Sequence, residues 1–433
     1  MAQVCVFGLW HLGCVTAACL AAAGHSVVGL DFDETVVSGL RSSKPPLFEP
    51  DLANLIASGL AMRRLRFTTD SADALGNADA LWVAFDTPVD ENDVADAAFV
   101  RQQVEAVRPF VRRGSLVLVS SQVPVGFTSS LEHDWQAHDS TLQFSYSPEN
   151  LRLGSAIEAF RHPARVVIGA DADVDRSRLA SLFAPFCSEL IWMSISSAEM
   201  TKHALNAFLA LSVVYANELA RICEHLGVDT TQVEDGLRTD PRIGAKAYIS
   251  PGAPIAGGTL ARDVTTLNAL ANDNHVAAPL IQSIGTSNRI HEQWLWKLAF
   301  EQVRDVNEPT IALLGLTYKA GTDTLRRSPA VSMARWLVTT GVRVRAFDPS
   351  VAKPSPELSQ IDLVAGLDEA LIGADLAIIM TPHAEFRMIT AERLVSRMRH
   401  PQLLDPSRFL SNLREGSGVR YLTIGQPREG VQS

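Results

Sequence analysis

The segment from Val4 to Asp33 constrains the fold most strongly, because it combines an apolar strand, a glycine turn, a helix and a second strand. The turn carries Gly8 and Gly13, and Asp31 stands at the end of the second apolar run. Such a βαβ unit brings backbone N–H groups to a dinucleotide pyrophosphate, and an acid at the second strand end binds the ribose hydroxyls. The segment therefore predicts dinucleotide binding, and Asp31 favours NAD, because a carboxylate repels the additional phosphate of NADP.

The turn departs from the GxGxxG pattern at one position. Trp10 stands where the middle glycine normally lets the backbone approach the pyrophosphate. The turn residues that we expect to contact the cofactor are Gly8, Trp10, His11, Leu12 and Gly13. The alternative is a Rossmann layer with a structural role alone.

Strands and helices continue to alternate beyond this unit. Leu65–Thr69, Ala78–Phe85 and Ser115–Ser120 have strand patterns, and a helix begins near Asp96. The alternation predicts a parallel, doubly wound α/β sheet, whose carboxyl strand ends carry the ligand site. The residues at these ends that we expect near the cofactor are Thr87, Pro88 and Gln122. Strand and helix patterns also alternate over residues 309–409, which predicts a smaller second sheet.

A long helical pattern separates the two regions. Ala198–Gly227 contains no proline and no glycine before its last residue, and its roughly 27 residues would span about 40 Å. So long a helix in the middle of a chain typically forms a spine between domains. Lys202 and Asn206 stand four residues apart and share one face, either as site residues or as a solvated pair at the helix start.

The composition narrows the functional classes. The chain has 433 residues, 47% of them hydrophobic, and a formal net charge of −10. It is long enough to bury two or three cores, and its negative charge argues against a general nucleic-acid or anionic-membrane surface. A local cationic pocket for an anionic small molecule is compatible with this charge.

Cysteine usage and hydropathy suggest a compartment. Five scattered cysteines, an odd number set in apolar runs, indicate reduced thiols and a cytoplasmic protein. The sequence has no CxxC, HExxH or histidine cluster, so we predict no metal site. No apolar run approaches the length of a membrane span, and the N-terminus lacks a basic region. We therefore expect neither a membrane segment nor a signal peptide.

Ordered sequence blocks resemble the UDP-glucose/GDP-mannose dehydrogenase family nearly from end to end. In chain order the longer ones are GHSVVGLDFDE, LFEPDLANLI, VPVGFTSS, SPENLRLGSAIEAFRHPARVVIGA, SAEMTKHALNAFLA, NELARICEHLGVD, DPRIG, LGLTYKAGTDTLRRSPA and FDPS. The resemblance implies an α/β fold with two Rossmann-like, doubly wound domains joined by the long helix and a small helical domain. It implies an NAD-binding domain over 1–196, a central dimerisation domain over 197–300 and a nucleotide-binding domain over 301–433. A homodimer is the assembly that it implies.

In this family a sugar C6 alcohol is oxidised twice with two NAD, and a cysteine in a GGxCxPKD loop carries a thioester intermediate. The corresponding segment here, Gly252–Val264, has no cysteine, and Thr259 takes its place when counted back from Asp263. The residues that match the family's catalytic set are Lys202, Asn206, Asp263 and Glu149. By this resemblance, Lys202 and Asn206 stabilise the developing alkoxide and oxyanion.

Other family positions are changed. Leu153 replaces the second glutamate of the PExLxE loop, Gln122 replaces a threonine, and Arg262 replaces a lysine. The replaced residues are those that serve thioester formation and hydrolysis in the family. The retained residues can polarise an alcohol for one hydride transfer. The Thr259 hydroxyl has no adjacent base in the sequence pattern and is therefore expected to be a hydrogen-bond donor rather than a nucleophile.

The resemblance also implies substrate contacts. The expected substrate-binding residues are Leu151, Arg152, Arg242, Gly257, Gly258, Thr259, Arg262 and Lys319. Arg326 matches an arginine on the cofactor side, and the alternative is that it only pairs with Asp323 on a loop surface. Because the glycine loop differs from that of the family, the sequence does not identify the sugar or the base of the substrate.

These residues predict an NAD-dependent dehydrogenase that acts on a CH–OH group. The preferred reaction is a single two-electron alcohol–carbonyl interconversion on a sugar nucleotide or another phosphorylated or anionic alcohol. One alternative is a 6-dehydrogenase that makes a uronate without the thioester cysteine. Another is a cofactor-binding paralogue without turnover, which Trp10 and the changed loop motivate.

Overall fold

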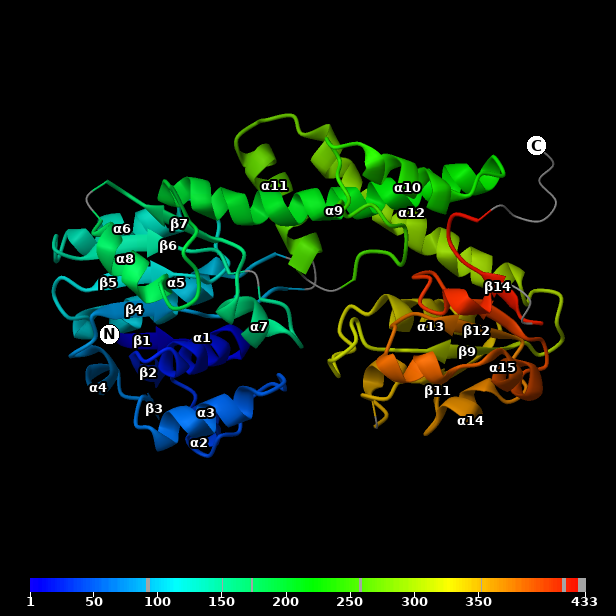
Figure 1. Cartoon of the computed structure of the whole chain (residues 1–433), viewed down its shortest axis with the longest axis horizontal. Helices are drawn as coiled ribbons and strands as arrows, with labels where there is room; N and C mark the ends of the chain where they lie inside the picture. The colour runs from blue at the N-terminus through cyan, green and yellow to red at the C-terminus, as the bar shows by residue number, and fades with distance from the viewer. Residues whose placement is uncertain are drawn as a thin grey trace. The chain divides into compact units, whose positions relative to one another are not determined.

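The chain divides into two compact units, Met1–Leu205 and Asn206–Ser433, each with its own sheet and core. The computed structural model describes residues 1–90, 94–149, 151–172, 174–256, 259–351, 353–414 and 418–426. One helix, α9 (Ile195–His225), runs from the first unit into the second. Figure 1 colours the first unit from blue to green and the second from green to red.

The described residues of the first unit form an eight-stranded sheet in the order β3-β2-β1-β4-β5-β6-β7-β8. Neighbouring strands are parallel except for β6 and β7, which are antiparallel. The strands are β1 (Gln3–Phe7), β2 (Ser26–Leu30), β3 (Leu65–Thr68), β4 (Ala80–Val83), β5 (Leu116–Val119), β6 (Gln143–Tyr146), β7 (Val166–Ala170) and β8 (Leu190–Met193). The order 3-2-1-4-5-6 is that of a Rossmann fold, with the ligand crevice at the carboxyl ends beside β1 and β4.

Helices cover both faces of this sheet, so its strands are apolar on both sides, as ALWV in β4 and LVLV in β5 show. One buried cluster packs α1, α3, α7 and α8 on one face, and another packs α5 and α6 on the other. The helices are α1 (His11–Ala22), α2 (Glu34–Arg41), α3 (Leu52–Ala61), α4 (Ser71–Leu75), α5 (Ala97–Val107), α6 (Phe127–Gln136), α7 (Ala156–Arg161) and α8 (Arg176–Phe183).

The second unit repeats the strand order in a smaller sheet. Its described strands run β11-β10-β9-β12-β13-β14, all parallel. They are β9 (Thr310–Leu314), β10 (Arg343–Phe347), β11 (Asp362–Leu363), β12 (Leu376–Ile379), β13 (Gln402–Leu404) and β14 (Arg420–Leu422). The helices of this unit after α9 are α10 (Thr230–Thr239), α11 (Thr259–Asp273), α12 (Pro279–Glu301), α13 (Pro329–Thr339), α14 (Leu367–Leu371) and α15 (Ala391–Arg397).

The predicted central helix is confirmed, with small changes at both ends. It has 31 residues and begins at Ile195, before the predicted start at Ala198. Gly227 has a φ of +71°, and the Val228 N–H donates to the Cys223 carbonyl at 2.8 Å, a glycine-terminated helix end. The predicted α/β fold class, with a Rossmann-like sheet at each end of the chain, is also confirmed.

One local expectation is wrong. The sequence predicts a glycine-rich loop over Gly252–Val264, but α11 begins at Thr259. From Thr259 onward the segment TLARDVTTLNALAND contains no glycine or proline, so nothing prevents a helix from starting there. Arg262 and Asp263 are therefore helical residues.

Candidate functional site

The glycine turn after β1 accepts only glycine at two positions. Gly8 has a φ of +95°, and a Cβ there would lie 2.8 Å from the Phe85 ring. A Cβ on Gly13 would lie 1.7 Å from the Gly8 carbonyl oxygen. Strand β1 and helix α1 are therefore joined at a separation that no side chain allows, which is the close packing of a dinucleotide turn.

Asp31 closes this turn from the end of β2. One carboxylate oxygen accepts the Leu9 N–H at 2.7 Å, and the other accepts the Asp33 N–H at 3.0 Å. The residue is only partly buried. It fits the ribose-binding acid that the sequence predicted.

Trp10 occupies the middle glycine position without strain. Its φ is −94°, a value open to any residue, and its side chain is 47% exposed. The indole therefore neither forces the turn apart nor lies inside the protein.

Two further carboxylates also hold the turn. Asp86, just beyond β4, accepts the Leu12 N–H at 3.0 Å. Glu49 is buried, and its Oε2 lies 2.9 Å from Nε2 of His11. The same Glu49 carboxylate accepts the N–H groups of Gly154 at 2.7 Å and Ala156 at 2.8 Å. It therefore ties the cofactor turn to the segment that follows the predicted substrate residues.

The ends of β4 and β5 are joined at the predicted cofactor positions. Thr87 is buried, and its hydroxyl donates to the Gln122 carbonyl at 2.7 Å. Pro88 is exposed beside it. These three residues thus lie at the carboxyl edge of the sheet, where a Rossmann ligand binds.

The start of α9 is fixed to this edge by buried polar side chains. Glu199 accepts the Gly126 N–H at 2.6 Å and the Thr128 N–H at 2.9 Å, and so caps α6. Burial raises the pKa of the Glu199 carboxyl, although the Thr128 and Gly126 hydrogen bonds oppose this. His203 lies 3.0 Å from the Val123 carbonyl. These contacts fix where the side chain between them, Lys202, can point.

Lys202 is buried, with 8% of its surface exposed, and its ammonium donates to the Glu149 carbonyl after β6. The alternative of a solvated pair at a helix start is therefore wrong. A desolvated ammonium is a strong electrostatic partner for an oxygen that becomes negative during a reaction.

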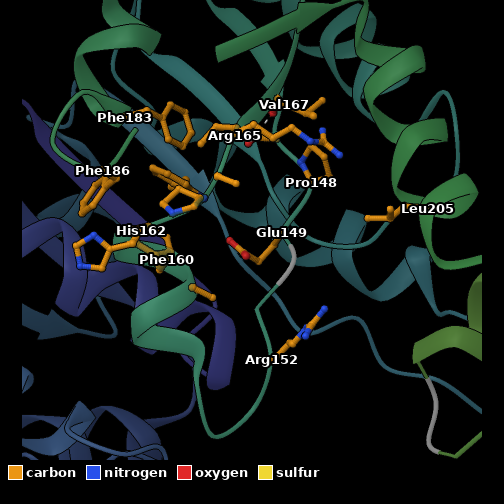
Figure 2. Close-up of a pocket in the computed structure, with 16 residues that line it drawn as sticks. Pro148, Glu149, Arg152, Phe160, His162, Arg165, Val167, Phe183, Phe186 and Leu205 are labelled. Atoms are coloured by element: carbon orange, nitrogen blue, oxygen red, sulfur yellow. Dashed lines mark hydrogen bonds between the residues drawn. The ribbon is translucent and has the colours of Figure 1, made fainter. Parts of the chain in front are cut away.

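A cavity of about 490 Å³ opens beside this segment of the first unit. Figure 2 shows Glu149 between the rings of Phe183 and Phe186 on one side and Arg152 and Leu205 on the other. Trp82, Phe160, His162 and Arg165 also line it. The lining combines aromatic rings with cationic groups, a combination that suits an anionic ligand with an apolar face.

In the second unit, Asn206 on α9 meets α11. Its amide donates to the carboxylate of Asp263, and the exposed fractions are 6% for Asn206 and 0% for Asp263. Since Lys202 precedes Asn206 by one helical turn, α9 presents a buried ammonium and a buried amide in succession.

The segment before α11 is held by three side chains. The Gly252 N–H donates to Asn217 at 2.8 Å, and Nε2 of His291 lies 2.9 Å from the Gly252 carbonyl. Asn288 accepts the Ile255 N–H at 2.8 Å. Burial lowers the pKa of His291 to about 4, even though the Gly252 contact favours protonation. Gly257 and Gly258 lie outside the described residues.

The remaining substrate predictions stay untested by the geometry. Thr259 is exposed at the start of α11, and Arg262 is partly buried one turn further on. Arg242 pairs with Asp240 of its own segment at 2.7 Å. Lys319 and Arg326 are exposed between β9 and α13, and Leu151 and Arg152 follow β6 in the first unit. The family resemblance suggested these positions, and they stay predictions.

The five cysteines are all unpaired, and none lies beyond Cys223. Burial raises the pKa of the Cys5 and Cys14 thiols far above neutrality, and that of Cys19 to about 12. These three thiols are therefore protonated at neutral pH and are not nucleophiles.

Among the described residues, no group of three or more His, Cys, Asp or Glu side chains is arranged to hold a metal ion. In the same part of the chain, no helix combines the length and apolarity that crossing a membrane requires.

Models of three domains match the chain in order. The NAD binding domain of the UDP-glucose/GDP-mannose dehydrogenase family matches residues 2–187, its central domain 196–290, and its UDP binding domain 312–412. The UDP-glucose 6-dehydrogenase of Pseudomonas aeruginosa is 32% identical, over 99% of this chain and 98% of that protein. That of Rhizobium meliloti is 31% identical, over 98% of this chain and all of that protein (100%).

Solved structures give the same result. A UDP-glucose dehydrogenase from the hyperthermophilic archaeon Pyrobaculum islandicum superposes with a TM-score of 0.85 at 28% identity, over 98% of this chain and 97% of that one. The matched residues include both sheets of this chain.

Proposed function

Because the chain belongs to the UDP-glucose/GDP-mannose dehydrogenase family, we propose that it is an NAD-dependent oxidoreductase that performs a single two-electron step. Its substrate in this proposal is a sugar nucleotide or a related anionic alcohol, which the family's UDP binding domain over 312–412 supports. The reaction converts CH–OH and NAD⁺ to C=O, NADH and a proton.

The first unit fits the cofactor. The contact between Gly8 and Gly13 gives the close turn, and Asp31 offers a partly exposed carboxylate to ribose hydroxyls. NAD, when bound, supplies the hydride acceptor. Thr87, Pro88, Gln122 and the turn residues are the proposed cofactor contacts.

The single-step proposal rests on which of the family's catalytic residues this chain keeps and which it lacks. Thr259 stands where the family has its thioester cysteine, and no cysteine follows Cys223. The residues proposed to serve hydride transfer are retained: Lys202 is buried and Asn206 is bonded to Asp263. Without a thiolate, the aldehyde-to-acid half of the family reaction lacks its covalent intermediate.

Each retained residue has a definite part in the proposed step. The Lys202 ammonium stabilises the negative charge on the substrate oxygen, an effect worth about 3 kcal/mol for a desolvated donor. Asp263 fixes the orientation of the Asn206 amide, which by the family resemblance stabilises the developing oxyanion. The exposed Thr259 hydroxyl serves as a hydrogen-bond donor to substrate, and Glu149 and Arg152 line the cavity that takes part of it.

Product counting tests the proposal. The chain is incubated with NAD and, separately, UDP-glucose, UDP-N-acetyl sugars, GDP-mannose and small phosphorylated alcohols, and NADH and product are quantified. One NADH and a carbonyl product per substrate supports the proposal, whereas two NADH and a carboxylate would show that the uronate route survives. No NADH with any substrate would favour a paralogue without turnover.

A variant pair links turnover to the site. Lys202→Met is expected to lower kcat by about a thousandfold. Lys297→Met removes the same charge from an exposed position on α12 and is expected to leave kcat unchanged. Equal rates in the two variants would contradict the role of Lys202.

A homodimer is the assembly that we propose. Phe208, Tyr215 and Ile222 recur every seventh residue on α9 and are 65%, 50% and 56% exposed. An exposed apolar stripe of this kind is typical of a surface covered by a partner. Light scattering should give twice the chain mass for the native protein, and Tyr215→Glu should shift it toward the monomer.

We also propose a cytoplasmic location. The five free cysteines are compatible with a reducing compartment. Fractionation of cells that express the chain, with thiol titration of the purified protein, tests this. Recovery with oxidised thiols outside the cytoplasm would contradict it.

A further inference from the structure

One backbone donor of the cofactor turn is already occupied by a side chain. Helix α1 begins at His11, and Trp10 provides no side-chain cap. The first N–H groups of such a helix have no partner within the helix, yet the Leu12 N–H donates to Oδ2 of Asp86 at 3.0 Å. In a dinucleotide turn these same N–H groups bind the pyrophosphate.

The sheet topology places Asp86 at this position. Strands β1 and β4 are parallel neighbours, and the Ala84 N–H donates to the Phe7 carbonyl at 2.8 Å. The Phe85 ring then packs against Gly8, and the Thr87 hydroxyl is bonded to the next strand end. The backbone on both sides of Asp86 is thus fixed, whereas its own side chain is exposed.

We infer that Asp86 is an intramolecular competitor of the cofactor pyrophosphate and that it sets the affinity for NAD. Its carboxylate satisfies the α1 N-terminus in the free protein, where a negative charge is favourable. The pyrophosphate claims the same donor and carries the same sign of charge. Binding therefore requires the carboxylate to rotate away from Leu12 and then to remain close to a like charge, both of which weaken binding. This inference rests on the proposed NAD-dependent function.

Calorimetric titration of the full-length protein with NAD tests the inference. Asp86→Asn keeps the size of the side chain and a hydrogen-bond acceptor but removes the charge, and Asp86→Ala removes both. Each variant is expected to bind NAD about tenfold more tightly than the native chain. A thermal scan of each variant establishes that it is folded.

Asp70→Asn is the matched control. Asp70 caps α4 in the same unit by accepting the Ala72 N–H at 2.8 Å, so this change removes one negative charge and alters one helix cap outside the cofactor turn. It is expected to leave the NAD affinity within error of the native value. A gain in Asp70→Asn equal to that in Asp86→Asn would show a general charge effect and overturn the inference.

Three other results are decisive. If the native chain binds NAD and Asp86→Asn binds it with unchanged or weaker affinity, the competition is overturned but the proposed function stands. The native chain could instead bind NAD more tightly in Mg²⁺ than in EDTA, with no such difference in Asp86→Asn. This result would mean that the carboxylate shares a cation with the pyrophosphate, and it would also overturn the competition. Absence of NAD binding in native and variant chains alike removes the proposed cofactor role and the inference together.

Discussion

The two sheets of the molecule share one strand order, yet their glycine turns leave different groups available. Each first strand ends in a glycine with positive φ, +95° at Gly8 and +85° at Gly315. In each, an aspartate at the end of the next strand accepts from the turn backbone. Asp31 accepts the Leu9 N–H at 2.7 Å, and Asp348 accepts the Leu316 N–H at 2.7 Å.

The two turns differ in the position and capping of the next helix. In the first unit α1 begins directly after the turn, at His11. In the second, α13 begins only at Pro329, and its N-terminus is capped by the Ser328 hydroxyl. Asp348 is buried there with His383, whose Nε2 lies 3.1 Å from its carboxylate.

The same kind of glycine turn therefore has a different role in each unit. Where the helix starts at once and the acid stays partly exposed, the turn can bind a dinucleotide. Where the acid is buried with a histidine and the helix is capped by its own serine, the turn contributes stability. Changes in the first turn should alter NAD binding, and changes in the second should alter only the free energy of unfolding.

Gly13→Ala is expected to have the largest effect of the substitutions that test the two turns. The added Cβ would lie 1.7 Å from the Gly8 carbonyl, so α1 must move away from β1, at a cost of about 3 kcal/mol or more. NAD binding should be lost by calorimetry. Gly315→Ala, whose Cβ would lie 2.5 Å from the Thr381 carbonyl, should destabilise the chain but leave the Kd for NAD unchanged. Loss of binding in both variants would contradict the division of roles.

Asp348→Asn tests the second turn alone. Burial raises the pKa of Asp348, but hydrogen bonds from His383, Thr317, Leu316 and Ser350 outweigh it and hold the pKa at about 2. Since the unfolded value is about 3.9, the ionised group contributes about 2 to 3 kcal/mol above pH ~5, and this is lost as pH falls toward 2.

The variant should therefore unfold more easily in urea at pH 7, and its difference from the native chain should shrink in acid. Its Kd for NAD should not change. A pH-independent difference would assign the effect to lost packing rather than to ionisation.

Asp31→Ala should have a smaller effect on stability and a clear effect on binding. Leu9 loses its acceptor at a partly exposed site, which costs about 1 kcal/mol. The Kd for NAD should rise about tenfold, and the preference for NAD over NADP should fall, because the repulsive carboxylate is gone. An unchanged cofactor preference would show that Asp31 only supports the turn.

Trp10→Gly should change least, although it restores the sequence pattern. The indole is 47% exposed, and its backbone has an ordinary φ. Glycine there should lower the free energy of unfolding by about 0.5 to 1 kcal/mol and change the Kd for NAD by less than about threefold. A gain of tenfold or more would mean that the indole obstructs the pyrophosphate.

Periodic features were predictable from the sequence because they arise between near neighbours. Gly8, Gly13 and Asp31 stand in one βαβ unit, and the long helix is uninterrupted until Gly227. The contacts of Asp86 and Glu49 could not be predicted because their partners are distant along the chain, with Asp86 74 residues from Leu12 and Glu49 105 residues from Gly154.

Two further misses have separate reasons. Glu199 looks like any solvated acid on a helix until the fold brings α6 to it, 71 residues away at Thr128. The loop expectation for Gly252–Val264 followed the family motif, whose proline position is Ala261 here. An alanine is compatible with a helix, so local propensity prevailed over the resemblance.

Trp10 has a practical consequence for fluorescence measurements rather than for affinity. The chain has seven tryptophans, of which Trp135 is buried at 0% exposure and gives a constant emission background. Trp10 lies half-exposed in the turn itself, and indole emission overlaps the absorption band of a reduced nicotinamide. The protein therefore carries an intrinsic fluorophore at its cofactor turn, and Trp10→Phe would isolate the signal of that one ring.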